Sequence, residues 1–385
     1  MPHFSGTFAT KLPGTDTSIF AIMSALSHEY NAINLSQGFP DFEVSDKLIT
    51  LVQEQMRKGL NQYAPMPGIL PLREQIALKT EKLYGAVYHP EKEINITAGA
   101  TQALFSIITA IIHEGDEAII LEPAYDSYAP TVKLCGGIPV HVPLELPDYH
   151  VNWELVKKVI NQKTRMIIIN TPHNPTGSIL SNDDLKALTK LTKNTDIIIL
   201  SDEVYEHLIF DNIRHESAFL YPELVERSFV VSSFGKTFHA TGWKMGYVLA
   251  PENLMKEFRK VHQFTVFACN TPVQYAMAEY LKDEANYLHL NQFYQDKRDL
   301  FLKLIQGSRF EIVPCRGTYF QVLNYNRISD EKETDFAKRL TIEHKIASIP
   351  ISPFYQKAID NKNLRFCFAK KDETLMKAAE ILVKI

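Results

Sequence analysis

Four short polar segments of the sequence contain residue types that could carry out chemistry, and each directly follows a short apolar run. Lys236 lies in SSFGKTF, which begins at Ser232, and Asp202 lies in SDEVY, which begins at Ser201. Asn174 lies between two prolines in NTPHNPTG, and TAGATQA begins at Thr97. Each segment alone also has an ordinary structural explanation, such as a surface lysine, a helix cap, a rigid loop or a strand-to-helix turn.

The segments could serve different chemical roles. A carboxylate placed after a strand, as Asp202 is, points into a crevice rather than into the core. The two X-Pro steps impose a stiff, non-helical turn, so Asn174 would be held as a fixed hydrogen-bond donor. The helix predicted to begin near Thr101 has free N–H groups at its start, which favour an anion such as a phosphate.

The elements that must position these residues alternate between short β-branched runs and longer helical patterns. This alternation predicts a mainly parallel α/β sheet with helices on both sides, in which ligands bind at the carboxyl ends of the strands. The predicted strands are 94–97, 118–121, 166–169, 197–200, 229–231 and 247–249, and the predicted helices between them include 101–112 and 183–191.

The remaining chain predicts a smaller α+β domain. We expect a long helical stretch over 252–296 and beyond, then strands at 319–323 and 365–368, a helix at 334–343 and a last helix from Asp372. Near the amino end, a helix capped by Asp16, Thr17 or Ser18 explains the short apolar run at 19–23 better than a secretion signal does.

Composition excludes several function classes. The 385 residues carry a formal net charge of −4, so no basic face for nucleic acid is expected. The four cysteines are scattered, which favours a reduced cytoplasmic protein, and neither they nor the histidines have metal-ligand spacing. No run approaches the roughly 18–20 apolar residues of a membrane helix.

Taken together and in order, the segments resemble the fold-type I, class I aminotransferases, which use pyridoxal phosphate. LSQGFPDF at 35–42, YAPMPG at 63–68, EPAYDSY at 122–128 and the longer SSFGKTFHATGWKMGY also match this family. The resemblance implies a large domain at 36–275 with a mainly parallel seven-stranded sheet, and a small α+β domain from 1–35 and 276–385. It also implies a homodimer with shared active sites.

The resemblance implies a role for each matching residue. Lys236 would form an imine with the cofactor aldehyde and, once freed, move a proton between the substrate α-carbon and cofactor C4′. Asp202 would keep the pyridine nitrogen protonated, so that the ring accepts electrons. Tyr205 and Asn174 would hydrogen-bond the ring 3-oxygen, and Tyr125 would stack on the ring. The phosphate would be bound by Gly99, Ala100, Thr101, Ser233, Lys244 and, from the neighbouring subunit, Tyr63.

The substrate end of the site is implied in the same way. Arg365 would bind the α-carboxylate with two parallel hydrogen bonds, close to the Gly38 backbone, Asn174 and Phe20. Aromatic pocket walls would favour a large apolar side chain, and no second arginine is evident for a dicarboxylate. We therefore expect methionine or an aromatic amino acid as donor, with glutamine or kynurenine as further options. The candidate walls are Phe20, Tyr63, Tyr125, Phe267 and Phe354.

Two alternatives stay open from the sequence. A β-C–S lyase on the same scaffold would use Lys236 and Asp202 but release ammonia and a thiol. A pyridoxal-phosphate-binding regulator of DNA would need an additional DNA-binding module, for which the first few dozen residues leave no room before the matching segments begin. Ammonia release, rather than amino transfer, would identify the lyase.

Overall fold

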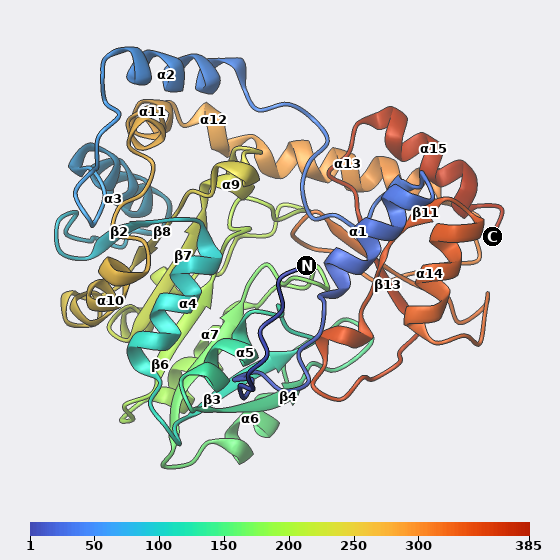
Figure 1. The fold of residues 1–385 in the computed structure, drawn as a ribbon, viewed down its shortest axis with the longest axis horizontal. Helices are drawn as coiled ribbons and strands as arrows, with labels where there is room; N and C mark the ends of the chain where they lie inside the picture. Colours follow the sequence, from blue (N-terminus) through green and yellow to red (C-terminus); the bar gives the residue numbers. More distant parts are fainter.

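The computed structural model describes residues 1–385. A seven-stranded sheet lies in the larger part of the molecule (Figure 1). All neighbouring strands are parallel except β8, which is antiparallel to both of its neighbours. In spatial order the strands are β2 (Ile94–Thr97), β8 (Gly246–Leu249), β7 (Ser228–Ser233), β6 (Ile198–Asp202), β5 (Thr164–Asn170), β3 (Glu117–Glu122) and β4 (Ile138–Pro143).

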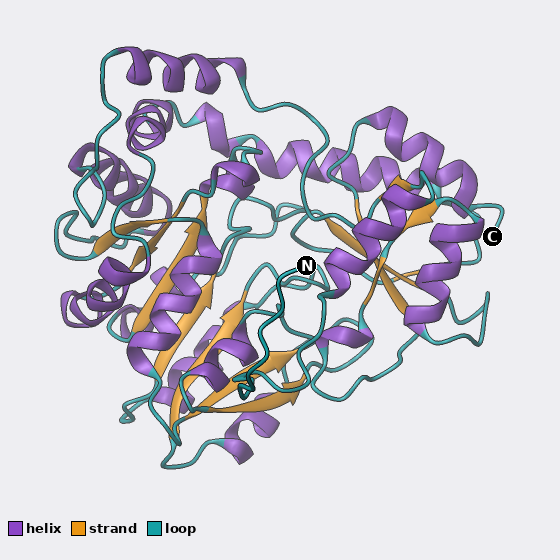
Figure 2. Cartoon of the chain, viewed as in Figure 1, coloured by secondary structure: helices purple, strands orange, loops and turns teal.

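Helices cover both faces of this sheet (Figure 2), which explains why its central strands are almost entirely apolar. Alternate residues of β5 face opposite ways: Met166 and Ile168 belong to one buried cluster, Ile167 and Ile169 to the other. The first cluster is completed by α4 (Ala100–Ile111), α5 (Tyr128–Leu134) and α10 (Glu252–Thr265). On the other face lie α6 (Trp153–Val159) and α7 (Asn182–Thr192), the latter capped by Ser181 and Asp184.

A four-stranded antiparallel sheet forms the smaller part. Its strands in spatial order are β12 (Ile349–Pro350), β13 (Asn363–Cys367), β10 (Phe320–Asn324) and β9 (Glu311–Ile312). The amino end joins this part, because α1 (Ile19–Glu29) packs beside α14 (Glu333–Glu343) and β1 (Ile33–Asn34) pairs in parallel with β11 (Ile346–Ala347) (Figure 1). The helices α13 (Leu290–Leu304) and α15 (Asp372–Leu382) pack against each other.

The remaining helices include α2 (Asp46–Arg57), α3 (Leu70–Tyr84), α11 (Thr271–Leu281) and the short α8 (Pro222–Val225), α9 (Phe234–Thr237) and α12 (Ala285–Leu288). Both α2 and α3 pack against α11. None of the helices is long and apolar enough to cross a membrane.

The predicted mainly parallel seven-stranded sheet is confirmed, as are the smaller strands and helices. Of the three proposed caps of α1, Ser18 is the one whose side chain accepts from a helix N–H. The helical stretch predicted over 252–296 is present but divided into separate helices. The first, α10, ends at Thr265, and α11 begins at Thr271, where Asn270 caps the new helix and Pro272 occupies its first turn. The domain boundaries at 35/36 and 275/276 stay a prediction.

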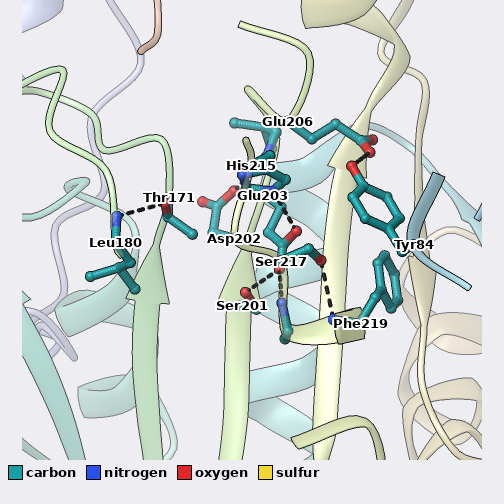
Figure 3. Close-up of polar contacts among 12 residues, drawn as sticks. Tyr84, Thr171, Leu180, Ser201, Asp202, Glu203, Glu206, His215, Ser217 and Phe219 are labelled. Atoms are coloured by element: carbon teal, nitrogen blue, oxygen red, sulfur yellow. Dashed lines mark hydrogen bonds and ion pairs between the residues drawn. The ribbon is translucent and has the colours of Figure 1, made fainter. Parts of the chain in front are cut away.

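A buried ion pair fixes α3 to the chain that follows β6. Lys79 Nζ lies 2.7 Å from Glu206 Oε1, and both side chains are almost fully buried. Tyr84, on the same helix, donates to the other oxygen of Glu206 (Figure 3). Burial is the largest single influence on the pKa of Glu206 and raises it. The charges of Lys79 and His207 and the hydrogen bonds from Lys79 and Tyr84 together outweigh burial and hold that pKa well below its ordinary value.

We therefore expect Lys79→Met to lower the free energy of unfolding by about 3–5 kcal/mol near neutral pH, because it leaves a buried carboxylate unpaired. A carboxyl group whose pKa is depressed in the folded state stabilises that state at pH values above its unfolded pKa, about 4.3. This stabilisation is lost as the pH falls below that value. The difference between variant and wild type should thus shrink below that pH. Denaturant titrations at several pH values measure it.

The matched control is Lys82→Met on the same helix, whose ion pair with Glu284 is exposed. Loss of that pair should change stability by no more than about 0.5 kcal/mol. Equal destabilisation by the two substitutions would contradict the importance of the buried pair.

Candidate active site

A cavity of about 220 Å³ opens where the parallel strands β5, β6 and β7 end. Every cofactor-binding residue predicted from the sequence lines this cavity except Tyr63. The structure thus brings together residues from five separate segments, as expected from the convergence of strand ends. The lining residues are Gly99, Ala100, Thr101, Leu104, Tyr125, Asn170, Asn174, Asp202, Val204, Tyr205, Ser233, Gly235, Lys236, Thr241, Lys244 and Met245.

Lys236 lies on α9, the short helix that follows β7 and is capped by the Ser233 side chain. Its Nζ donates to the Tyr319 hydroxyl at 2.8 Å and to the Gly38 carbonyl at 3.0 Å. The Tyr205 and Tyr319 rings lie 5.7 and 5.5 Å from the same nitrogen. Burial lowers the pKa of Lys236 to about 8, so the amine reaches its neutral, nucleophilic form much closer to physiological pH than a surface lysine does.

Asp202 is the last residue of β6 and is buried. Its Oδ2 accepts a hydrogen bond from the Tyr128 hydroxyl at 2.6 Å, while its own carbonyl accepts from the Asn170 side chain at 2.8 Å. Burial raises the pKa of Asp202 to about 6, although the bond from Tyr128 opposes this shift. A carboxylate of this kind is suited to hold a proton jointly with a weakly basic ligand nitrogen.

The opposite end of the cavity is built for an anion. Gly99 precedes α4 with φ +80° and no side chain caps the helix, so the first N–H groups face the cavity without an intrahelical partner. A Cβ added to Gly99 would lie 3.3 Å from Lys244 Nζ, which shows how closely that ammonium approaches the glycine. Helix start, ammonium and the hydroxyls of Thr101 and Ser233 together form a site for a phosphate.

Arg365 lies beside the cavity on β13 and is buried. It donates to the Asn174 side-chain oxygen at 2.7 Å and to the Ser36 carbonyl at 3.1 Å, and its Nε has no partner. The guanidinium carbon lies 3.9 Å from the centre of the Phe320 ring and 5.2 Å from that of Phe20. Burial lowers the pKa of Arg365 to about 10, far above neutrality, so the group stays cationic.

Tyr125 and Tyr205 line the cavity, whereas Phe354 and Phe20 lie outside its lining. Tyr125 donates to or accepts from Thr101 Oγ1 at 3.1 Å, which places its ring at the phosphate end. Tyr205 is buried and its ring packs edge-on against Tyr319 at 5.2 Å. Phe354 is buried against Phe20, with ring centres 5.5 Å apart.

Tyr63 and Phe267 lie elsewhere. Their rings pack edge-on at 5.2 Å, and both are exposed, Tyr63 by 83%. Tyr63 lines a separate surface hollow together with Gln62, Cys269 and Asn270. Neither Tyr63 nor Phe267 lines the cavity of its own chain. Their assignment as pocket walls, and that of Tyr63 to the phosphate of a neighbouring subunit, stay predictions.

Sequence reasoning missed three residues at the site. Phe320 begins β10 and Tyr319 directly precedes it, in a segment that was predicted as a strand without any link to the cavity. Tyr128 lies within EPAYDSY, whose first tyrosine alone was considered. The spacing Tyr125–Tyr128 on a helical turn could have indicated that both tyrosines contact one neighbourhood. No group of three or more histidine, cysteine or acidic side chains could hold a metal ion.

These features suit pyridoxal phosphate. The group has an aldehyde, a ring nitrogen and a phosphate, and the cavity offers an amine of lowered pKa, a buried carboxylate and an anion cradle. The cradle depends on a glycine because any side chain at position 99 would approach Lys244. The residues present therefore fit the cofactor that the sequence resemblance implied.

Comparisons with known proteins agree with this geometry. Residues 30–382 match the family described as aminotransferase class I and II. The chain is 46% identical to the methionine aminotransferase of Escherichia coli K12 over 97% of both chains, and 34% identical to human kynurenine–oxoglutarate transaminase 3, covering 98% of this chain and 90% of the human one. The solved structure of YbdL from Escherichia coli, whose reported function is methionine aminotransferase, superposes with a TM-score of 0.96 at 45% identity, covering 98% of this chain and all of the other.

Proposed function

The chain belongs to the class I and II aminotransferases, enzymes that depend on pyridoxal phosphate, and we propose that its preferred amino donor is L-methionine or an aromatic amino acid. The observation that carries this choice is that the Phe20 and Phe320 rings lie against Arg365 and that Phe354 packs on Phe20. No arginine lines the cavity itself, so a second carboxylate would find no bidentate partner there. The 46% identity to a methionine aminotransferase supports the same substrate class.

The residues at the substrate end bind and orient the amino acid. Arg365 binds the α-carboxylate, and its flat guanidinium is fixed between two rings before the substrate arrives. Asn174 links this arginine to the cofactor end because its side-chain oxygen accepts from Arg365 Nη1. The Gly38 carbonyl accepts a hydrogen bond from Lys236 Nζ, and we propose that the backbone of Gly38 also approaches the substrate carboxylate.

At the reacting end, Lys236 removes the proton from the substrate α-carbon. Its lowered pKa provides the neutral amine that a base requires. Bound pyridoxal phosphate supplies an electron-accepting ring that stabilises the negative charge on that carbon. Asp202 would hold a proton at the ring nitrogen, Tyr205 and Asn174 would donate to the ring 3-oxygen, and Tyr125 would cover one ring face. Gly99, Ala100, Thr101, Ser233 and Lys244 would bind the phosphate.

A half-reaction tests this proposal. The purified holoenzyme is mixed with L-methionine without any 2-oxo acid, and the products are assayed. One equivalent of 2-oxo acid per chain without ammonia would support amino transfer. Continuous release of ammonia and thiol from an S-alkylcysteine, whose sulfur is on the β-carbon, would instead identify a β-C–S lyase. No product from methionine or aromatic amino acids would refute the substrate choice. Kynurenine and glutamine are compared in the same assay.

Arg365→Lys tests the carboxylate contact. The substitution keeps the positive charge but removes the planar fork, so we expect kcat/KM for methionine to fall about 10- to 100-fold, mainly through a higher KM. Arg327→Lys, at an exposed position, is the matched control and should leave both constants unchanged. A KM for Arg365→Lys equal to that of wild type would contradict the assigned contact.

We also propose a homodimer in which Tyr63 of the partner subunit reaches the phosphate. The exposed aromatic side chains of Tyr63, Phe264 and Phe267 support this arrangement, since exposed aromatics in proximity favour association. Sedimentation of the holoenzyme should give twice the chain mass, and a monomer with full activity would contradict the shared site.

A cytoplasmic location is proposed as well, supported by four cysteines that are all unpaired.

A further inference from the structure

We propose that Tyr128 is a positioning residue that fixes the orientation of Asp202 and weakens this carboxylate as a base. The inference rests on the proposed pairing of Asp202 with the cofactor ring nitrogen. Tyr128 itself does not line the cavity, so it would act only through Asp202.

The geometry gives Tyr128 one polar partner. The residue begins α5, is buried, and its hydroxyl donates a single hydrogen bond, 2.6 Å long, to Asp202 Oδ2. The other carboxylate oxygen receives only a long contact from the Val204 N–H, at 3.4 Å. Oδ2 is therefore held on one side by Tyr128, which fixes the plane in which the carboxylate faces the cavity.

Packing alone does not require this hydroxyl. The hydroxyls of Tyr88 and Tyr294 are buried in the same protein without any partner. A phenylalanine would fill the space of the Tyr128 ring, whose edge-on contact with Tyr125 involves carbon atoms at a centre distance of 5.7 Å. The hydroxyl at position 128 is thus best explained by the carboxylate that it contacts.

The groups around Asp202 have opposing effects on its basicity. Glu203, the next residue, is buried on the far side of β6, where Ser201, His215 and the Ala218 N–H surround its carboxylate (Figure 3). Burial raises the pKa of Asp202 to about 6, and Glu203 adds to that rise. The bonds from Tyr128 and Val204 and the charge of Lys236 act in the opposite direction. Tyr125 and Tyr205 are the other titratable groups that face it.

Tyr128 provides the strongest of these opposing contacts. A carboxylate and a ring nitrogen that share one proton leave it on the stronger base. By donating to the carboxylate, Tyr128 stabilises its charged form and so leaves the proton on the ring nitrogen. Without the hydroxyl, Asp202 is a stronger base, free to rotate, and it takes the proton from the ring.

The test compares Tyr128→Phe with wild type as full-length holoenzymes loaded with ¹⁵N-labelled pyridoxal phosphate. We expect the ring-nitrogen chemical shift to move toward that of the unprotonated ring, and kcat to fall about tenfold with KM for methionine within about twofold. Tyr325→Phe is the matched control, since it removes the hydroxyl of a buried tyrosine that follows β10 and donates to the main-chain carbonyl of Glu331. It should change neither quantity.

Asp202→Asn separates this inference from the proposed function. An unchanged ring-nitrogen shift in Tyr128→Phe, together with an inactive Asp202→Asn enzyme, would overturn the role of Tyr128 alone. A fully active Asp202→Asn enzyme would overturn the role of Asp202 itself. If Tyr128→Phe does not fold, 3,5-difluorotyrosine at position 128 serves instead. As a stronger donor it should shift the ring nitrogen toward full protonation, and no shift would again overturn the proposal.

Discussion

Lys236→Ala is expected to fold and to bind pyridoxal phosphate without a covalent bond, but to lose amino transfer by a factor of about 10⁴ or more. Two functions disappear together, the covalent attachment of the cofactor and the base that takes the α-carbon proton. No neighbour replaces them, because the other cavity amine, Lys244, lies at the anion end beside Gly99. Single-turnover release of 2-oxo acid from methionine measures the loss.

Lys190→Ala, on the solvent-exposed surface of α7, is the control and should behave as wild type. Reduction of the holoenzyme with borohydride should fix the cofactor to the wild-type chain and to the control but not to Lys236→Ala. Wild-type turnover in Lys236→Ala would refute the central assignment of the site, and attachment of cofactor at another lysine would refute its location.

Asp202→Ala is expected to lower kcat about 10²- to 10³-fold, because an unpaired ring nitrogen is a poorer electron acceptor. The effect should appear in proton removal from the α-carbon, so the kinetic isotope effect with α-deuterated methionine should increase. Cofactor affinity should fall as well, since a buried contact is lost.

The control for Asp202 is Asp183→Ala, at an exposed position in the first turn of α7. Its kinetic constants should match those of wild type. An Asp202→Ala enzyme with unchanged kcat and unchanged isotope effect would show that the ring nitrogen is protonated by other means, and the role given to Asp202 would be wrong.

The strand ends were predictable from the sequence because each motif directly follows a short apolar run of the kind that forms a buried strand. The positions of Asn174, Asp202 and Lys236 at one edge of the large sheet follow from that pattern and from parallel topology. The break within the helical stretch over 252–296 was not predictable from periodicity, since it depends on a local cap and a proline. Strand β4 was missed because its two prolines weaken the strand signal, and it lies at the sheet edge, where proline is tolerated.

The motifs could not predict contacts between distant parts of the chain. Tyr319 donates to the carbonyl of Gly38, which is 281 positions earlier, and the same oxygen accepts from Lys236. Nothing in the local sequence of Tyr319 indicates this partner, because it depends on how the two sheets are placed. Tyr128 was overlooked for a different reason, since its hydroxyl reaches Asp202 from a helix on one face of the sheet.

The pairing of β1 with β11 sets an order for events during synthesis on the ribosome. Residues 33–34 can find their partners at 346–347 only after nearly the whole chain has been made, and the same holds for Ser36 with Arg365. All strands of the large sheet lie within residues 94–249, so they are synthesised well before residues 346–365. A nascent chain can therefore assemble its cofactor cradle first, while the amino-terminal segment waits unpaired. Because domains fold as units during translation, the substrate end of the site is completed last.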